Sequence, residues 1–373
     1  MIKIEEINTF KQALGLKQEW DKLVDEAGLD ICLSFDFVAS LWEAYLDKKD
    51  VILLLVKEEN KLLAIFPLFI DKEKISIIFS INIIKPITNL TSWYNDFIIK
   101  SKTAEVIHAV LDYLGKRYNW DIFEITGDYT GVKNDSNVMR WINQERRYRF
   151  IKRKASDSFY IKWAGSWEEY LRKKSRKFRK NLKRGERKLK ENVKYEIKYF
   201  TKPEDLDFVF EKIYEIESKC WKKYTIFFSK EREIFFRTYF KKIAPEGELL
   251  VAFLCMEEEY AAFDIYLIGK EKAYIITGSY KDKFQEYSPG FILTNHVLQK
   301  LTESKVSELD LGVGSWPRWR PMEWKKRWAT GSKENYWVWL YNNKHWYVIC
   351  YYYLRRLSGL TRDIMQCRKV DEK

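Results

Sequence analysis

The chain has no apolar run long enough to cross a membrane and no segment resembling a signal peptide. A spanning helix needs about 20 consecutive apolar residues, and no segment of the 373-residue sequence approaches that length. The first ten residues, MIKIEEINTF, lack a basic region followed by an apolar stretch. The sequence therefore predicts a cytoplasmic protein, and it leaves open contact with the inner face of a membrane.

Residues that bind metal ions or act as nucleophiles are scarce. The five cysteines and three histidines are scattered and form no CxxC pair, so we expect no metal site. No Cys–His or Ser–His pairing is evident either, which argues against a covalent enzyme intermediate.

The positive charge of the chain is concentrated in one segment. Residues 172–190 contain twelve Lys or Arg and one acid, Glu186, a local charge of +11 within a total of +13. Twelve charges of one sign repel each other without a counter-charge. The segment therefore needs an explanation of its own.

The pattern of predicted helices and strands occurs twice, about 200 residues apart. Each copy has two helices, three strands joined by hairpins, a third helix and a last strand. In the first copy these elements lie at 8–26, 36–48, 51–56, 62–70, 75–80, 103–118 and 120–126. In the second they lie at 203–221, 229–243, 249–255, 261–268, 273–279, 290–304 and 307–313. The turns DKEK (71–74) and GKEK (269–272) lie at matching places.

This repetition predicts an α/β (α+β) fold of two tandem domains, each with a mixed, mostly antiparallel sheet flanked by helices. We expect a first domain at 1–155, a basic helix and connecting segment at 156–200, and a second domain at 201–373. The active cleft is expected between the two copies.

The stretch Tyr287-Ser288-Pro289-Gly290 is the strongest local signal in the chain. It follows a predicted strand and opens a predicted helix, with Ser288 at the N-cap position and Pro289 at the first helical position. The free N–H groups at such a helix start bind anions, phosphate above all. The first copy lacks this Ser-Pro-Gly turn, so the second copy is expected to be the working one.

Several motifs resemble the GNAT acyltransferases. Gln285-Glu286-Tyr287-Ser288-Pro289-Gly290 is similar to the Gln/Arg-x-x-Gly-x-Gly/Ala segment of that superfamily, with Ser288 in place of the first glycine. The sequence SRKFRKNL (175–182), the strand end LDLGVG (309–314) and WKKRW (324–328) resemble the two-domain branch of the cellulose-biosynthesis CelD-like proteins, which are related in fold to the FemAB transferases. The resemblance covers residues 165–330 well and 1–150 only through architecture.

This resemblance implies that the second copy binds acyl-coenzyme A. The pyrophosphate would be held by the backbone N–H groups of Ser288, Gly290 and Phe291. The residues expected at the cofactor are Gln285, Tyr287, Ser288, Pro289, Gly290, Phe291, Arg176 and Arg179.

Acyl transfer to an amine also needs a base and a proton donor. The candidate bases are Asp264, which interrupts an apolar strand, Asp310, at a strand end beside glycine, and Glu323, with Asp310 preferred. Tyr280 is the candidate proton donor, and Tyr287 is also near the turn. Trp316, Trp324 and Lys325 are candidates for acceptor binding, or belong to a loop that covers the cleft.

The basic segment has four candidate partners: coenzyme A, an anionic acceptor, acidic lipid headgroups and RNA. Leu171, Phe178, Leu182 and Leu189 form an apolar stripe along it, by which one helix could dock with its charges outward.

The sequence thus predicts an acyl-coenzyme A-dependent N-acyltransferase acting on an amine, most simply an amino sugar or precursor in cell-surface polysaccharide assembly. The alternatives are a Fem-type transferase that takes its aminoacyl group from charged tRNA, and a non-enzymatic protein that binds nucleic acid or another anionic polymer. In the last two cases residues 172–190 would contact the polymer.

Overall fold

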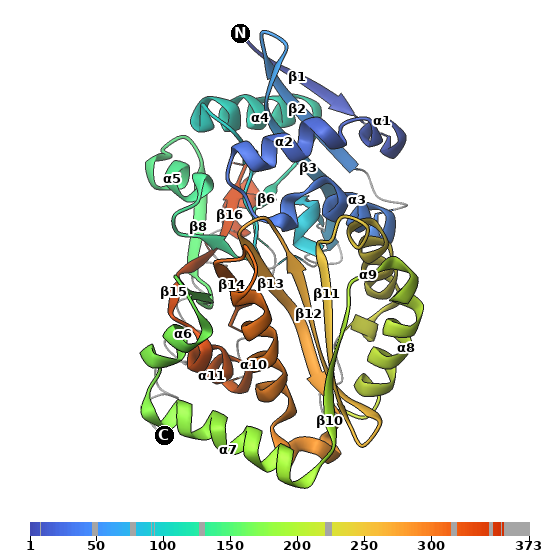
Figure 1. The fold of residues 1–373 in the computed structure, drawn as a ribbon. Coiled ribbons are helices and arrows are strands. Elements are labelled where there is room, and N and C mark those ends of the chain that lie inside the picture. Colours follow the sequence, from blue (N-terminus) through green and yellow to red (C-terminus); the bar gives the residue numbers. More distant parts are fainter. Residues whose placement is uncertain are drawn as a thin grey trace. The chain divides into compact units, whose positions relative to one another are not determined.

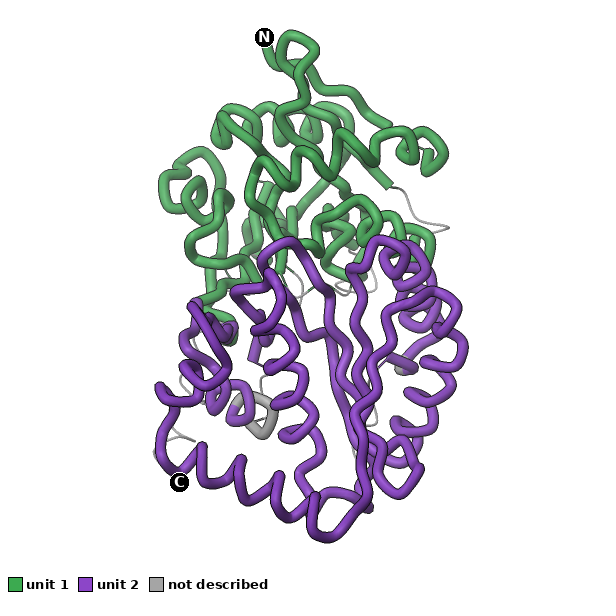
Figure 2. The backbone as a smooth tube through the Cα atoms, in the orientation of Figure 1, with its two compact units in different colours: residues 1–156, 334–373 green, residues 157–333 purple. Residues whose placement is uncertain are grey.

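The computed structural model describes residues 1–7, 9–46, 51–74, 80–90, 92, 94–126, 131–220, 226–314, 319–342, 346–351 and 353. The chain divides into two compact units (Figure 2). Unit 1 comprises the described residues of 1–156 and 334–373, and unit 2 comprises those of 157–333. Among the described residues, no helix has the length and apolar composition that a membrane span requires.

Unit 1 is built on a mixed sheet in which nine strands are described. Its path is β1 (Ile2–Ile7), β2 (Val51–Glu58), β3 (Lys61–Lys74), β4 (Ser80–Pro86), β6 (Ile122–Glu124), β16 (Asn335–Tyr341) and β7 (Val132–Lys133). Off this path, β5 (Ile98–Ile99) pairs with β3, and β8 (Arg149–Lys154) pairs with β16. The helices are α1 (Phe10–Leu14), α2 (Lys17–Glu26), α3 (Phe35–Tyr45), α4 (Thr103–Arg117) and α5 (Asn137–Gln144).

Unit 2 repeats this plan in a seven-stranded sheet (Figure 1). Its order is β10 (Tyr195–Phe200), β11 (Leu249–Met256), β12 (Glu259–Ile268), β13 (Lys272–Tyr280), β14 (Glu308–Val313), β9 (Ser158–Lys162) and β15 (Gly331–Lys333). Its helices are α6 (Trp167–Lys173), α7 (Arg176–Asn192), α8 (Leu206–Glu217), α9 (Lys230–Ile243), α10 (Pro289–Thr302) and α11 (Trp319–Trp328). The predicted fold class is confirmed.

The duplication extends to backbone detail. The hairpins β2–β3 and β11–β12 both turn through two residues with positive φ, Glu59–Asn60 and Glu257–Glu258. Such pairs form type I′ turns, whose twist matches that of the strands. Soon after the turn, the second strand of each hairpin has a β-bulge at an extra residue, Leu63 in β3 and Ala261 in β12. The two copies therefore align at a constant offset through these strands, and Phe66 of β3 corresponds to Asp264 of β12.

The last described strand, β16, differs from the prediction. Residues 335–341 were expected in the second domain, but β16 pairs with β6, β7 and β8 of unit 1. Strand β9, from the segment that was expected to be a connector, takes the corresponding place beside β14 in unit 2. Both sheets gain an antiparallel partner for a strand that would otherwise be an open edge.

The basic segment is also divided differently. It forms two helices, because α6 ends at Lys173 and the Ser175 side chain accepts the Phe178 N–H to begin α7. Leu171 therefore lies on α6 rather than in the stripe of α7. Phe178, Leu182 and Leu189 are buried as that stripe predicts.

Two smaller expectations change as well. The predicted helix at 8–26 is two helices that meet near Gly15. Residues 71–74 are the end of β3 rather than a turn, and the predicted strand 75–80 falls outside the described residues except for Ser80, which begins β4.

Candidate active site in the second unit

Two parallel neighbours, β13 and β14, separate in the middle of the sheet of unit 2. They pair only at Lys272–Glu308, Ala273–Leu309 and Tyr274–Asp310. Beyond Tyr274, β13 continues to Tyr280 as a partner of β12, while β14 pairs with β9. Backbone groups on the facing edges of these strands are thus left out of the ladder between them, and they can bind a ligand that lies along the strands.

The predicted turn begins α10 with an unexpected backbone geometry. Ser288 has φ 53° and ψ 51°, in the left-handed region, and its side chain makes no capping hydrogen bond. Ser288 is thus the N-cap residue, as predicted, but it caps the helix without its side chain. A left-handed residue at this place explains why glycine suits it, because an L-residue pays about 1–2 kcal/mol there. Pro289 occupies the first helical position as predicted.

The amides of this turn are only partly free. The Ser288 N–H donates to the Gln285 carbonyl at 3.0 Å, and the Phe291 N–H donates to the Ser288 carbonyl at 2.9 Å. Within the described residues the Gly290 amide has no acceptor. Of the three donors expected to bind pyrophosphate, the Gly290 N–H is thus the one at hand, at the positive end of α10.

Gly290 leaves space in front of this amide. A Cβ atom built on it would have the Tyr280 ring as its nearest neighbour, at 3.9 Å. Tyr280, at the end of β13, is therefore beside the turn, as its proposed role requires.

A basic side chain also reaches the turn, but it is neither of those predicted. Lys188 of α7 donates to the Glu286 carboxylate at 2.9 Å and lies 4.9 Å from the centre of the Tyr287 ring. Arg179 donates instead to the carbonyls of residues 171, 172 and 174 at 2.9–3.4 Å. This guanidinium closes the C-terminus of α6, and Arg176 is exposed at the first position of α7.

Asp264 is a buried carboxylate beneath the first turns of α10. It is 5% exposed and lies on the sheet face that packs against Ile292 and Leu293. The Tyr266 hydroxyl donates to Asp264 Oδ2 at 3.0 Å, and the Thr294 hydroxyl lies 3.2 Å from the same oxygen. Burial and the neighbouring charge of Asp264 raise the pKa of Tyr266 well above its usual value. Tyr266 therefore remains a proton-bearing donor at physiological pH.

The backbone of β13 makes room for this carboxylate. A Cβ on Gly278, the partner of Asp264 across the ladder, would meet Asp264 Oδ1 at 1.9 Å. Only glycine fits such an approach without displacement of the chain.

Asp310 has structural partners on both oxygens. Oδ1 accepts the Gly312 N–H at 2.7 Å, and Oδ2 lies 3.2 Å from the Lys272 ammonium. It pairs with Tyr274, at the end of β13 opposite to Tyr280. Asp264 and Asp310 are both 5% exposed and both have partners, so an amine that reached either carboxylate would have to displace a neighbour.

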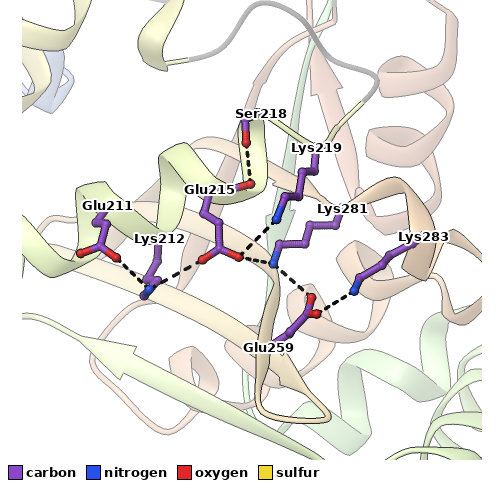
Figure 3. A network of polar contacts seen from close by, with 8 residues as sticks. All are labelled: Glu211, Lys212, Glu215, Ser218, Lys219, Glu259, Lys281 and Lys283. Carbon is purple, nitrogen blue, oxygen red and sulfur yellow. Dashed lines mark hydrogen bonds and ion pairs between the residues drawn. The ribbon is translucent and has the colours of Figure 1, made fainter.

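A network of charges fixes the chain where β13 ends (Figure 3). Lys281 is 1% exposed, and its ammonium lies 2.6 Å from Glu215 of α8 and 3.2 Å from Glu259 of β12. The hydrogen bond from Lys281 holds the pKa of Glu215 below its usual range. The hydrogen bond from Lys283, more than that from Lys281, holds the pKa of Glu259 below its usual value. The network anchors the 3-10 helix at Asp282–Tyr287 that leads into Ser288.

Two of the predicted acceptor residues, Trp324 and Lys325, lie on α11. The Lys325 ammonium donates to the Val313 carbonyl at 2.7 Å, which joins α11 to the end of β14. Trp324 is partly buried against the core. Trp316 lies outside the described residues.

Three residues at this site escaped the sequence analysis: Lys188, Lys281 and Thr294. Lys281 gave a signal, since it is a cation directly after an apolar strand. Lys188 is one of twelve cations in its segment, and only the packing of α7 on α10, with Gly185 against Ile292, selects it.

Comparison with known proteins agrees with this geometry. Residues 176–326 match the family model of the acetyltransferase (GNAT) domain. That range begins with α7 and ends within α11, so it contains the separated strands, the left-handed turn and Asp264. This part of unit 2 is therefore similar to GNAT acetyltransferase domains.

Solved structures similar in fold cover both units of the chain. FemX matches with a TM-score of 0.61 at 11% identity, over 90% of this chain and 97% of FemX. A conserved protein of unknown function from Bacteroides thetaiotaomicron has a TM-score of 0.54 at 11% identity, over 92% and 100%. L-PGS from Bacillus licheniformis has 0.54 at 13%, over 91% and 96%. At these identities the likeness concerns the fold, which is Fem-like. No curated protein sequence matches the chain.

Proposed function

We propose that this acyltransferase takes its acyl group from acyl-coenzyme A and transfers it to an amine through unit 2. The observation that carries the proposal is the buried carboxylate of Asp264. The equivalent position in unit 1 is Phe66, which is fully buried. The fold therefore accepts an apolar side chain there, and a desolvated carboxylate needs another reason, because its burial costs free energy.

The residues of unit 2 suit the steps of a direct transfer. The Gly290 amide and the positive end of α10 would hold the pyrophosphate, with Lys188 beside them. Asp264 would accept a proton from the amine as its nitrogen attacks the thioester carbon. The C–S bond then breaks, and Tyr280 would donate its proton to the departing thiolate.

For the acceptor we propose an amino sugar or related precursor in cell-surface polysaccharide assembly. The support is the likeness of SRKFRKNL, LDLGVG and WKKRW to the CelD-like branch. Trp324 and Lys325 of α11 supply an aromatic face and a cation near the end of β14, and aromatic faces with polar neighbours suit sugar rings.

A Fem-type reaction with charged tRNA is the second candidate. Two observations favour it: the amides of Ser288 and Phe291 already hold acceptors within the chain, and the fold of both units resembles that of FemX.

Calorimetry separates the two candidates. Acetyl-coenzyme A is titrated into the wild type and into Gly290→Ala and Gly290→Asp. Alanine fits the space at residue 290, while aspartate places a negative charge at the pyrophosphate and still suits a helix start. We expect binding by the wild type and the alanine variant, and a loss of at least about tenfold with aspartate. Equal binding by both variants, or binding of charged tRNA alone, would contradict the coenzyme proposal. Thiol release with a panel of amino sugars then tests the acceptor.

A further inference from the structure

The outer face of α7 carries a continuous row of cations. Seven exposed side chains form this basic row: Arg176, Lys177, Lys180, Lys183, Arg184, Arg187 and Lys190. Their spacing places them on one side of the helix, opposite the buried Phe178, Leu182 and Leu189. At 1.5 Å per residue the row extends over about 20 Å.

The described residues neutralise little of the basic row. Six of its members form no ion pair with any described residue, and Arg187 lies 3.8 Å from Glu191. Elsewhere in unit 2 clustered lysines have carboxylate partners, as in the network around Lys281. Like charges at helical spacing destabilise the helix. A partner with many negative charges would offset that cost.

The helix that carries the row is firmly held. Lys174 lies just before the N-terminus of α7. Its ammonium donates to the carbonyls of Trp328 and Ala329 at 2.5 and 2.7 Å. Phe178 packs on Trp328 with ring centres 5.0 Å apart. A Cβ on Gly185 would lie 3.1 Å from the Ile292 side chain of α10. The charges are therefore presented on a fixed surface.

A cavity of about 580 Å³ adjoins the basic row, between α6, α7 and α10. Trp167, Leu171 and Leu182 give it an apolar wall, and Lys183, Arg187 and Lys190 of the row line its other side. Asn295 is 3% exposed there, and its Oδ1 has no hydrogen-bond partner among the described residues.

The cavity also contains two carboxylates, and both have partners. Glu186 lies 3.3 Å from His296 and accepts a hydrogen bond from Asn295 at 3.0 Å. Although burial acts to raise it, the contact with His296 holds the pKa of Glu186 below its usual value. Glu191 is the partner of Arg187. Lys183 and Lys190 thus remain available to an anion.

We propose that the basic row and this cavity bind acidic phospholipid at a membrane surface. The headgroup phosphate meets Lys183, Arg187 and Lys190, a headgroup hydroxyl can donate to Asn295 Oδ1, and the apolar wall takes the first part of an acyl chain. The rest of the row faces neighbouring headgroups. Single-stranded RNA would use aromatic side chains for stacking, and the row has none. The inference does not depend on the donor or acceptor of the transferase.

Vesicle flotation tests this surface with the full chain. Phosphatidylcholine vesicles with and without phosphatidylglycerol are compared for the wild type and for Lys180→Gln/Lys183→Gln/Arg187→Gln/Lys190→Gln. The matched control removes four exposed lysines of unit 2 outside α7: Lys202→Gln/Lys230→Gln/Lys241→Gln/Lys305→Gln. Circular dichroism checks that each variant is folded.

We expect the wild type to bind acidic vesicles and not neutral ones, with weaker binding at high salt. The α7 variant should lose about a hundred-fold in affinity, since each cation near an acidic surface contributes, and the control should stay within a few-fold. Equal losses in both variants would overturn the proposal. Binding of a mixed-sequence RNA without vesicle binding would assign the row to nucleic acid and overturn it as well.

The cavity has its own test with soluble ligands. Calorimetry compares short-chain dihexanoylphosphatidylglycerol with glycerophosphoglycerol, its headgroup alone. Tighter binding of the acylated ligand, weakened in Lys183→Gln/Lys190→Gln, supports the cavity as the lipid site. Equal affinity for both ligands, or no binding of either, would show that the apolar wall takes no acyl chain.

Discussion

The two units share one backbone plan and differ in the side chains placed at corresponding points. Both hairpins have the same turn and the same bulge. The corresponding helices α4 and α10 both begin after a left-handed residue, Lys102 with φ 55° in unit 1 and Ser288 with φ 53° in unit 2. A left-handed residue before this helix is therefore common to both copies, while the Ser-Pro-Gly sequence is found in the second copy and not in the first, as expected.

The chemistry at that turn is what separates the units. Lys102 places its ammonium 2.7 Å from Glu58, and Glu105 puts a negative charge in the first turn of α4. The first turn of α10 contains no acid. An anion would be repelled at the first helix and attracted at the second. The comparison teaches that the function of a duplicated fold is decided by a few side chains on a retained backbone.

Among substitutions that test the difference between the units, replacement of Asp264 should have the largest effect on turnover. We expect Asp264→Asn to lower the turnover of acyl transfer by about a hundred-fold or more, the usual contribution of a general base. The neutral amide keeps the shape and can still meet Tyr266 and Thr294, so the melting temperature should change little. Turnover is measured with acetyl-coenzyme A and the best amine of the panel.

The control for that experiment is Asp310→Asn. It loses the ion pair with Lys272 and should reduce stability while turnover of the folded fraction is kept. A greater loss of turnover in Asp310→Asn than in Asp264→Asn would return the role of base to Asp310.

The second prediction compares the loss of stability when the lysine before α10, Lys281, or the lysine before α4, Lys102, is replaced by methionine. Lys281→Met leaves Glu215 and Glu259 without their buried partner, and we expect a loss of about 2–3 kcal/mol in the free energy of unfolding. This is below the full cost of a broken buried pair because the carboxylates are 35% and 44% exposed. Lys102→Met, whose side chain is 42% exposed, should cost much less, because an ion pair at the surface contributes little to stability.

Urea unfolding at neutral pH and under acid measures both variants. The pKa values of Glu215 and Glu259 are lowered in the folded protein. The stability that they contribute is present above their unfolded pKa and is lost as the pH falls through the folded pKa. The difference between wild type and Lys281→Met should therefore shrink in acid. A difference that grows in acid would contradict the network.

The contact of Lys174 with the carbonyls of Trp328 and Ala329 has no counterpart among the described residues of unit 1, because helices α6 and α7 belong to unit 2. The pH dependence of stability tests this contact. Burial lowers the pKa of Lys174 to about 8, so the unfolded chain binds the extra proton between about pH 8 and 10.5 and stability rises with pH in that window. Lys174→Met also removes the donor to the carbonyls at the end of α11, at a cost of about 1–2 kcal/mol.

Unfolding free energies at both ends of this window test the Lys174 contact. The cost of Lys174→Met should be greater at the alkaline end, since only the wild type gains stability there. A cost that stays constant or falls would show that Lys174 keeps an ordinary pKa.

The repetition of elements, the helix start at Pro289 and the burial of Phe178 and Leu182 could be predicted from the sequence, because periodicity and turn residues act locally. Lys188 and Thr294 could not, since their neighbours come from other helices and strands. Nor could the place of β16, because apolar alternation shows that a strand exists and not which sheet it joins. The left-handed Ser288 was suggested only by the glycine that the family has there.

The coenzyme A affinities of Gly290→Asp and Ala104→Asp test the central claim most directly. Both substitutions place aspartate at the second position of corresponding helices, α10 in unit 2 and α4 in unit 1. We expect Gly290→Asp to weaken binding at least about tenfold and Ala104→Asp to leave it unchanged. Equal effects, or a greater loss from Ala104→Asp, would contradict the assignment of the coenzyme to unit 2.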